Sequence, residues 1–310
     1  MGTDKRVQIL LSTYNGETYL RAQLESFLDL ENINSCRILI RDDGSTDGTR
    51  NILEEYRTKS NFQIVCGKNW GTTKSYEWLI RNSDPSCDYF AFSDQDDVWL
   101  PQKLSIAIEA LEQLSGQTPA LFGSRTCVTD QALHPIGVSV PLKRGTSFYN
   151  AMVQNVLPGH TQVFNRALWT LLAERGLYGA HVVDWWVYLA ASGLGKVVFS
   201  NAVTVLHRQH DSNSIGYRVG ALRGLQKKLI YLIQGKGNSI SLQLSAFLKC
   251  YGDILPAAYQ DEVRAYLEGL TTISARLKYL RHSQVFRQES GEDVAFRLLY
   301  LLGKYNLQWQ

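Results

Sequence analysis

Short apolar stretches alternate with segments of helical spacing through the first third of the chain. Apolar, β-prone residues occupy positions 7–11, a polar break follows, and apolar positions then recur at helical spacing over 19–30. The same order predicts a strand over 37–40, a helix over 49–56, a strand over 62–66, a helix over 75–81 and a strand over 89–93. Strands and helices that alternate in this way are typical of a mostly parallel α/β sheet.

The pattern is looser after residue 116. It predicts a strand over 120–127, a loop rich in proline and glycine, a strand near 162–164, a helix through 185–191 and a strand over 196–206. From residue 216 onward the spacing is helical. The chain is therefore expected to end in a C-terminal helical region.

The first part of that region is basic and amphipathic. Leu222, Leu225 and Leu229 share one helical face, and Arg223 and Lys227 lie on another. Such a segment most often packs its apolar face on a neighbouring domain. Contact with a membrane surface is the alternative, because leucines and basic residues also suit the lipid interface.

Composition is that of an ordinary globular protein, with 45% hydrophobic and 20% charged residues. The net charge is only +3, and no long run of lysine or arginine is present to follow a phosphate backbone. Nucleic acid is therefore not expected as a partner.

Five widely spaced cysteines form no Cys-x-x-Cys pair, which favours reduced thiols in the core of a cytoplasmic protein. Residues 1–7 lead directly into the first strand without the apolar core of a secretory signal. No apolar stretch approaches the roughly 20 residues that a membrane-spanning helix needs. We expect a soluble or peripheral protein.

Polar motifs follow three of the predicted strands. Residues 12–16 come after the first strand, residues 42–47 after the second, and residues 94–97 after the fourth. In open α/β sheets, ligands bind beyond the carboxyl ends of the strands. These three loops are therefore the candidate binding site.

The third loop places Asp94, Asp96 and Asp97 within four positions. Carboxylates this close repel one another, and Mg²⁺ or Mn²⁺ relieves that repulsion while leaving room for phosphate oxygens. The alternative is that Asp97 caps a helix beginning near Pro101. Capping needs only one acid, so three acids favour a metal.

The second loop carries Asp42, Asp43 and Asp47 around Gly44. Its acids can accept hydrogen bonds from a base ring or from ribose hydroxyls. It is equally typical of a turn followed by a helix capped by Asp47 or Thr46.

Together these segments resemble the family 2 glycosyltransferases of the GT-A fold over about residues 7–213. The resemblance is carried by Ser-Thr-Tyr-Asn-Gly at 12–16, Asp-Asp-Gly-Ser-Thr-Asp-Gly-Thr at 42–49 and Asp-Gln-Asp-Asp at 94–97. The longer string at 93–103, Arg41 and the run at 207–213 are similar to bacterial rhamnosyltransferases of surface polysaccharide synthesis.

The resemblance implies a Rossmann-like GT-A fold, a mostly parallel sheet flanked by helices, with a C-terminal helical extension. It implies a catalytic domain over 1–215 and a helical region over 216–310. Within the catalytic domain, residues 1–115 would form the nucleotide-sugar-binding half and residues 116–215 the acceptor-binding half.

The resemblance also assigns donor-binding roles. Ser12 and Asp43 would lie against the nucleobase, and Asp94 would reach the ribose or the metal. The metal ligands would be Asp96, Asp94 and His210, holding Mg²⁺ or Mn²⁺. The remaining donor-binding residues implied are Tyr14, Asn15, Asp42, Gln95, Arg208 and His210.

His207 and His160 fit the family's sequence pattern less well than His210 does. Arg208, His210 and Asn213 fit the family's Arg-x-His-x-x-Asn pattern near the diphosphate, which favours His210 over His207. His160 is expected to face the acceptor.

The family's catalytic base is an acid ahead of a helix in the second half, and Asp184 in His-Val-Val-Asp-Trp-Trp fits that position. Transfer with inversion then needs no covalent intermediate, because Asp184 takes the proton of the attacking acceptor hydroxyl. A purely structural role as a helix cap is the alternative for Asp184.

The expected reaction is transfer of L-rhamnose from dTDP-rhamnose to a hydroxyl of a polysaccharide or lipid-linked saccharide. A polyprenyl-diphosphate-linked acceptor, a homodimer and peripheral contact with the inner face of the plasma membrane are compatible with it. A UDP-hexose donor, a metal-dependent phosphohydrolase or nucleotidyltransferase using Asp42 and Asp43, and an inactive nucleotide-sugar-binding protein stay open. A nicotinamide enzyme is disfavoured, because no Gly-x-Gly-x-x-Gly follows the first strand.

Overall fold

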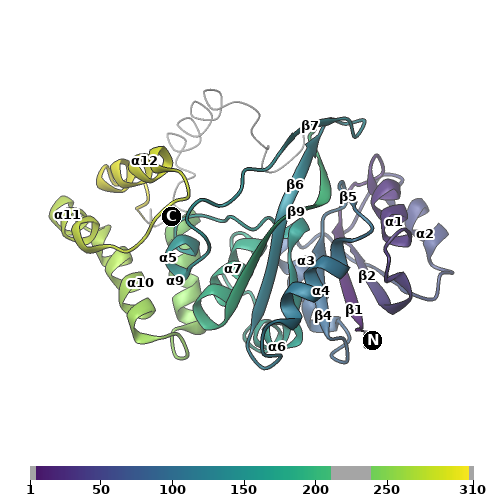
Figure 1. The fold of residues 1–310 in the computed structure, drawn as a ribbon, viewed down its shortest axis with the longest axis horizontal. Helices are drawn as coiled ribbons and strands as arrows, with labels where there is room; N and C mark the ends of the chain where they lie inside the picture. The colour runs from purple at the N-terminus through teal and green to yellow at the C-terminus, as the bar shows by residue number, and fades with distance from the viewer. Residues whose placement is uncertain (1–4, 211–238, 307–310) are drawn as a thin grey trace. The chain divides into compact units, whose positions relative to one another are not determined.

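The structure is a computed structural model that describes residues 5–210 and 239–306, and these residues divide into two compact units (Figure 1). Within the described residues, the first unit comprises 5–141, Leu157–Leu177 and 195–210. The second comprises Leu142–Val156, Tyr178–Leu194 and 239–306. Each unit is therefore assembled from segments that are separated along the chain.

The described residues of the first unit contribute nine strands to one sheet, in the order β3-β2-β1-β4-β8-β6-β9-β5, with β7 paired to β6. The strands are β1 (Val7–Thr13), β2 (Cys36–Asp42), β3 (Phe62–Cys66), β4 (Tyr89–Ser93), β5 (Val98–Trp99), β6 (Ala120–Thr129), β7 (Pro135–Val138), β8 (Val163–Asn165) and β9 (Lys196–Arg208). The predicted α/β class is confirmed.

Strand directions divide the sheet into two halves. Strands β1 to β4 are parallel, as the repeated strand and helix pattern predicted. Beyond β4 the sheet is mixed, because β8 pairs antiparallel with β4 and β6, whereas β6 and β9 are parallel. Strand β7 forms where we expected an irregular loop, since the short turn after β6 permits a hairpin but no helical crossover.

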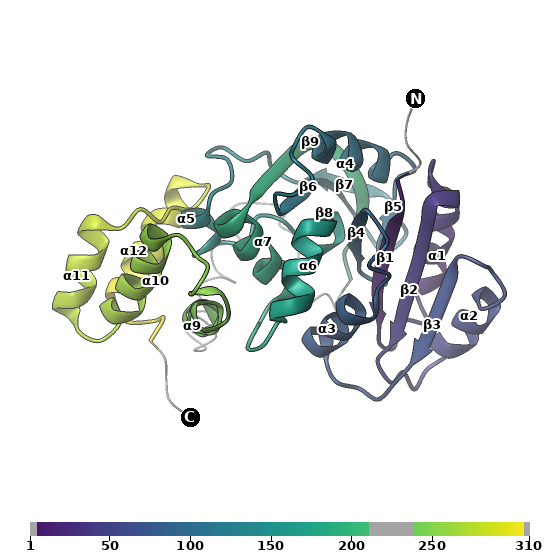
Figure 2. The same ribbon diagram turned by 90° about the horizontal axis from the view of Figure 1, so that it is seen from below.

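Helices cover both faces of this sheet (Figure 2). One face packs on α1 (Leu20–Leu28), α2 (Thr49–Tyr56) and α4 (Lys103–Glu112), and the short 3-10 turn η1 (Ile33–Ser35) precedes β2. The other face packs on α3 (Thr72–Asn82) and α6 (Arg166–Arg175). Aromatic stacking of Phe90 on Trp169, with ring centroids 5.0 Å apart, fastens α6 to β4.

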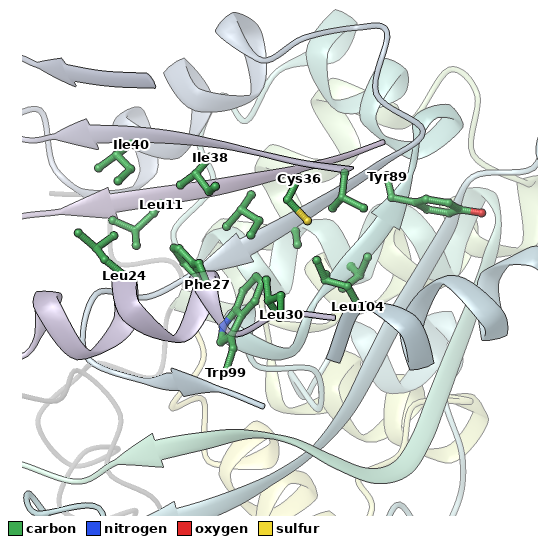
Figure 3. Packing of buried hydrophobic residues seen from close by; sticks show 14 of the residues in the cluster. Leu11, Leu24, Phe27, Leu30, Cys36, Ile38, Ile40, Tyr89, Trp99 and Leu104 are labelled. Atoms are coloured by element: carbon green, nitrogen blue, oxygen red, sulfur yellow. The ribbon is translucent and has the colours of Figure 1, made fainter. Parts of the chain in front are cut away.

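The core beneath α1 also fixes β5. Alternate residues of β1 point into this core, and Phe27 of α1 meets Trp99 of β5 edge to face at 5.0 Å (Figure 3). The backbone N–H of Trp99 donates to Ser26 Oγ at 3.1 Å. A buried aromatic side chain of this size stabilises the fold by about 1.5–3 kcal/mol, so the loop before β5 has a firm anchor.

That anchor explains one difference from the sequence-based expectation. Residue Asp97 is followed by the strand Val98–Trp99 rather than by a helix. The helix α4 begins at Lys103, and its N-cap is Gln102. Asp97 is therefore no helix cap.

The second unit is helical in its described residues. It contains α5 (Phe148–Ala151), α7 (Val183–Leu194), α9 (Ser239–Tyr251), α10 (Ala257–Gly269), α11 (Ile273–His282) and α12 (Ser290–Leu301). Trp186 of α7 packs edge to face on Phe247 of α9 at 5.3 Å. The expected helical character of the C-terminal region is present, while the predicted basic segment at 218–236 lies outside the described residues.

Two further properties bear on the sequence-based expectations. All five cysteines are free, but only Cys36 and Cys87 are buried and Cys66 is exposed, so the expectation of core thiols was too broad. Within the described ranges, no helix has both the length and the apolar character needed to cross a bilayer.

The start of β9 depends on a close backbone approach. The N–H of Lys196 donates to the carbonyl oxygen of Pro119 at 2.8 Å, which brings Gly195 against the same carbonyl. A Cβ on Gly195 would lie 1.9 Å from that oxygen. Glycine is therefore required here for β9 to enter the sheet beside β6.

Replacing Gly195 with alanine is expected to lower the free energy of unfolding by about 1–3 kcal/mol, because backbone must move to relieve the overlap. Gly116→Ala is the matched control, since no atom lies within 4 Å of its added Cβ. Urea unfolding followed by tryptophan fluorescence compares the two variants. Equal midpoints for both would contradict the steric argument.

Candidate functional site

The loops that follow β1 and β4 are tied together by one side chain. Gln95 accepts hydrogen bonds at its Oε1 from Thr13 Oγ1 at 2.6 Å and from the N–H of Tyr14 at 2.9 Å. Its Nε2 donates to the carbonyl oxygen of Tyr14 at 3.2 Å. The predicted residues Tyr14 and Gln95 are thus brought together at the carboxyl edge of the sheet.

A second network joins the ends of β1, β2 and β3. Ser12 Oγ lies 2.6 Å from Ser75 Oγ, and Arg41 donates to Ser75 Oγ at 3.1 Å and to the Asp43 carboxylate. Asp43 also accepts from the backbone N–H groups of Trp70 at 2.9 Å and Gly71 at 2.8 Å. Ser12 and Asp43 therefore belong to one hydrogen-bonded cluster, although internal donors already surround the Asp43 carboxylate.

The loop after β2 is held in a comparable way. Asp42 is fully buried and accepts from Ser45 N–H at 3.2 Å and from Arg50 Nε at 2.8 Å. Asn15 Oδ1 accepts from the N–H of Thr46 at 2.9 Å, which links the loops after β1 and β2. The main role of Asp42 in this structure is to close its own turn.

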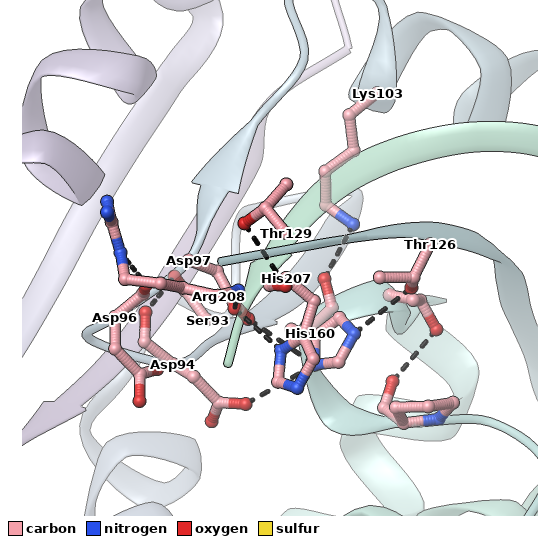
Figure 4. A network of polar contacts seen from close by, with 12 residues as sticks. Ser93, Asp94, Asp96, Asp97, Lys103, Thr126, Thr129, His160, His207 and Arg208 are labelled. Carbon is pink, nitrogen blue, oxygen red and sulfur yellow. Dashed lines mark hydrogen bonds and ion pairs between the residues drawn. The ribbon is translucent and has the colours of Figure 1, made fainter. Parts of the chain in front are cut away.

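The acid loop after β4, residues 94–97, contains carboxylates in unlike surroundings (Figure 4). Asp94 keeps 45% of its side chain exposed, whereas burial together with the charge of Asp94 raises the pKa of Asp96. Asp96 Oδ2 lies 2.8 Å from Nε2 of His210. The predicted metal ligands Asp96 and His210 are therefore neighbours.

Asp97 has a different function in the loop. Its side chain is inaccessible to solvent, and its Oδ1 lies 2.7 Å from His207 Nδ1 and accepts from the N–H of Arg208 at 3.3 Å. Burial alone would lower the pKa of His207, but the hydrogen bond and charge of Asp97 outweigh burial and raise it. Asp97 therefore binds the end of β9 to the acid loop.

His160 is buried inside the first unit. Its side chain is 5% exposed, its ring stacks on His207 at 4.6 Å, and its Nε2 lies 3.1 Å from Thr126 Oγ1. Its Nδ1 faces Asp97 Oδ2 at 3.4 Å and Asp94 Oδ2 at 3.5 Å. Burial lowers the pKa of His160 to about 3, so the ring is neutral near pH 7. The short 3-10 turn η2 (Gly159–Thr161) holds the ring in this buried position, and the expectation that His160 faces the acceptor stays a prediction.

Lys103 is a buried residue of this network that the sequence reasoning missed. Its Nζ donates to the carbonyl oxygen of His160 at 3.0 Å and lies 4.5 Å from the centre of the Trp99 ring. Burial lowers the pKa of Lys103 to about 7, although the charge of Asp97 opposes the shift. The sequence did contain a sign of this burial, because Lys103 lies four positions before Ala107 and therefore on the apolar face of the helix.

Arg208 and His210 share an aromatic neighbour. The guanidinium of Arg208 lies 4.8 Å from the centre of the Tyr19 ring, and the His210 ring stacks on Tyr19 at 4.8 Å. Arg208 Nε also donates to the carbonyl oxygen of Asp96 at 3.1 Å. Both predicted donor-binding residues are thus fixed directly beside the acid loop.

Within the described residues, one group at this edge brings its ligand atoms close enough together to hold a cation. The ring nitrogens of His160 and His207 and a carboxylate oxygen of Asp97 all lie within 4.8 Å of one another. The Lys103 ammonium next to this group disfavours a second positive charge there. The predicted set, Asp94, Asp96 and His210, is not gathered to this spacing in the described residues, although Asp96 Oδ2 lies 2.8 Å from His210 Nε2. Its oxygen and imidazole ligands suit Mg²⁺ or Mn²⁺, and its role as a metal site stays a prediction.

Asp184 belongs to the second unit, where it lies in the first turn of α7. Its side chain is half-buried, and Oδ1 accepts from the N–H of Trp185 at 2.8 Å. An acid in a first helical turn is favoured by the helix dipole. Its proposed role as a base stays a prediction.

Asp97→Asn is expected to lower the free energy of unfolding by about 1.5–3 kcal/mol, because a charged partner of buried His207 is lost. Asp96→Asn should cost little or even stabilise the fold, since the raised pKa of Asp96 means that the folded state disfavours its charge. Thermal unfolding at pH 7.5 compares the variants. A larger loss for Asp96→Asn would reverse the assignment of the two acids.

The sequence is similar to a known protein family. Residues 8–164, about half of the chain, match the family described as Glycosyl transferase family 2. The dTDP-rhamnosyl transferase RfbG of Shigella flexneri is 28% identical over 227 residues, which cover 67% of this chain and 74% of that protein.

Solved structures agree with the fold. The structure of S. aureus TarS 1-349 in complex with UDP-GlcNAc is similar with a TM-score of 0.60 at 16% identity, covering 97% of this chain and 88% of that one. The mannosyltransferase PcManGT from Pyrobaculum calidifontis, in complex with GDP-Man and Mn²⁺, gives a TM-score of 0.50 at 13% identity, covering 96% and 85%. The sheet, its flanking helices and the family match together show that this chain belongs to glycosyl transferase family 2 and has the GT-A fold.

Proposed function

We propose that the protein is an inverting, metal-dependent glycosyltransferase that moves L-rhamnose from dTDP-L-rhamnose to a saccharide hydroxyl. The observation that carries the proposal is the acid loop at residues 94–97, held against Arg208 and His210 at the carboxyl edge of the sheet. Similarity to the dTDP-rhamnosyl transferase RfbG supports the choice of donor.

The donor would lie along the loops that follow β1, β2 and β4. Ser12 and Asp43 would face the nucleobase, with Tyr14, Asn15, Asp42 and Gln95 shaping the same loops. Because Asp42 and Asp43 already bind internal donors, they are poor candidates for a second metal centre. A two-metal phosphohydrolase is therefore less well supported than a transferase.

A divalent cation would be held by Asp94, Asp96 and His210. The charge of Asp94 contributes to the raised pKa of Asp96, and a bound cation would relieve that repulsion. When bound, Mg²⁺ or Mn²⁺ supplies positive charge for the departing diphosphate. Arg208 adds a second, permanent positive charge beside the loop.

Transfer would proceed as a single displacement. The acceptor oxygen forms a bond to the anomeric carbon as the bond from that carbon to the diphosphate oxygen breaks on the opposite face. We assign Asp184 as the base that takes the acceptor proton, a contribution of typically about 10²- to 10⁴-fold. The acceptor would be a polysaccharide or a polyprenyl-diphosphate-linked saccharide at the inner face of the plasma membrane.

The donor and the metal are tested together. We expect dTDP-rhamnose with Mn²⁺ or Mg²⁺ to raise the unfolding temperature more than UDP-glucose, UDP-galactose or UDP-GlcNAc does, because ligands of the folded state stabilise it. Excess EDTA and Asp96→Asn should each abolish the effect of the donor. A larger shift with a UDP-hexose would contradict dTDP-rhamnose as the donor. Full transfer activity in EDTA would contradict the proposed metal dependence.

Asp184→Asn is expected to lower kcat by at least about 10²-fold while leaving the unfolding temperature and the donor affinity unchanged. The amide keeps the shape of the carboxylate but accepts no proton. Asp261→Asn, at an exposed position on α10 of the same unit, is the control. Transfer at the wild-type rate by the Asp184 variant would leave this residue with a purely structural role.

A further inference from the structure

Apolar side chains are exposed along two neighbouring helices of the second unit. Each is more than half exposed, and they recur every four residues: Ile273 and Leu277 on α11, Val294 and Leu298 on α12, and Leu302 at the C-cap of α12. Residues four apart lie on the same face of a helix. Each helix therefore carries an apolar stripe that faces solvent.

The two stripes lie on one surface. Arg276 of α11 donates to the carbonyl oxygen of Leu301 at 3.2 Å, and Arg297 of α12 donates to that of Leu280 at 3.3 Å. The beginning of α11 thus lies beside the end of α12, and the end of α11 lies beside an earlier part of α12. The two helices therefore pack antiparallel (Figures 1 and 2). Tyr279 and Tyr300 point to the buried side, and the stripes occupy the opposite, outer side.

The charged residues of α11 have one sign. Helix α11 contains no acidic residue, and its Lys278 and Arg281 are exposed. Lys304, just after α12, is exposed as well. The acids of α12 are bound inside the unit, because Asp293 pairs with Arg297 at 2.9 Å and Glu292 accepts from Gln154 at 3.2 Å. The α11–α12 face is therefore both apolar and basic.

We infer that the α11–α12 face, defined by Ile273, Leu277, Lys278, Arg281, Leu298 and Leu302, docks on an anionic lipid surface. Aliphatic side chains that enter the headgroup boundary and basic side chains beside them match such a surface. A second copy of the chain fits less well, since a two-fold contact through this face would bring Lys278 and Arg281 of both copies together. This docking does not depend on the donor or on the catalytic residues.

The test uses flotation of the full chain with vesicles of phosphatidylcholine alone or with about one third phosphatidylglycerol. Wild-type protein should float with the anionic vesicles at low salt and much less at about 0.5 M salt, where charge is screened. Absence of flotation with anionic vesicles at low salt would overturn the inference.

Two pairs of substitutions separate the apolar and the basic contributions. Leu277→Asp with Leu298→Asp, and Lys278→Gln with Arg281→Gln, should each weaken binding by about tenfold or more. The second pair should also flatten the salt dependence. The controls are Ile254→Asp and Lys249→Gln, which change exposed residues of the same unit outside this face and should bind as wild type.

Two further measurements decide between the alternatives. Unfolding temperatures of all variants should match wild type, because the altered side chains are exposed. Wild-type binding by both double variants would place any lipid affinity elsewhere in the chain and overturn the inference. Loss of a dimer in light scattering, with flotation unchanged, would assign the face to self-association. Transfer to a soluble acceptor should be unaffected, so this result is independent of the proposed activity.

Discussion

A buried carboxylate joins two parts of the chain that are 110 residues apart. Asp97 lies at the end of the acid loop, and its Oδ1 meets the ring of His207 at 2.7 Å near the end of β9. Because Arg208 and His210 follow directly, their positions beside Asp96 depend on this contact. Lys103 and His160 surround the contact from α4 and η2. The placement of Arg208 and His210 beside the acid loop therefore depends on one buried contact between a carboxylate and an imidazole.

Three acids within four positions consequently have three environments. Asp97 is buried against a histidine, Asp96 contacts a second histidine, and Asp94 is the most accessible of the three, with 45% of its side chain exposed. Burial and the charge of Asp94 raise the pKa of Asp96. Residue type alone does not distinguish such roles, since they arise from what packs around each carboxylate. Asp94 and Asp96 are accessible enough to contact a ligand, whereas buried Asp97 holds the structure of the loop.

The sequence predicted the first four strands and their helices closely, because local periodicity decides those elements. It also placed Tyr14, Gln95, Asp96, Arg208 and His210 at one edge of the sheet, where the structure brings them together. It missed the roles of Asp97 and Lys103, whose partners are remote in sequence and leave no local pattern. It assigned Asp42 and Asp43 to a ligand without foreseeing the internal donors that they bind. Burial of His160 was unpredictable for the same reason, since only tertiary packing decides which way η2 turns.

The discontinuous make-up of the second unit limits how the chain can be divided. Helices α5 and α7 precede β9 in sequence, yet Phe148 of α5 stacks on Tyr259 at 4.5 Å and Trp186 of α7 packs on Phe247 and Tyr251. A chain shortened after residue 215 would keep the first members of these pairs and lose the second. Aromatic surface that is now covered would then meet water, and such surface promotes aggregation. Because the segments of the two units alternate along the chain, no single cut separates one unit from the other.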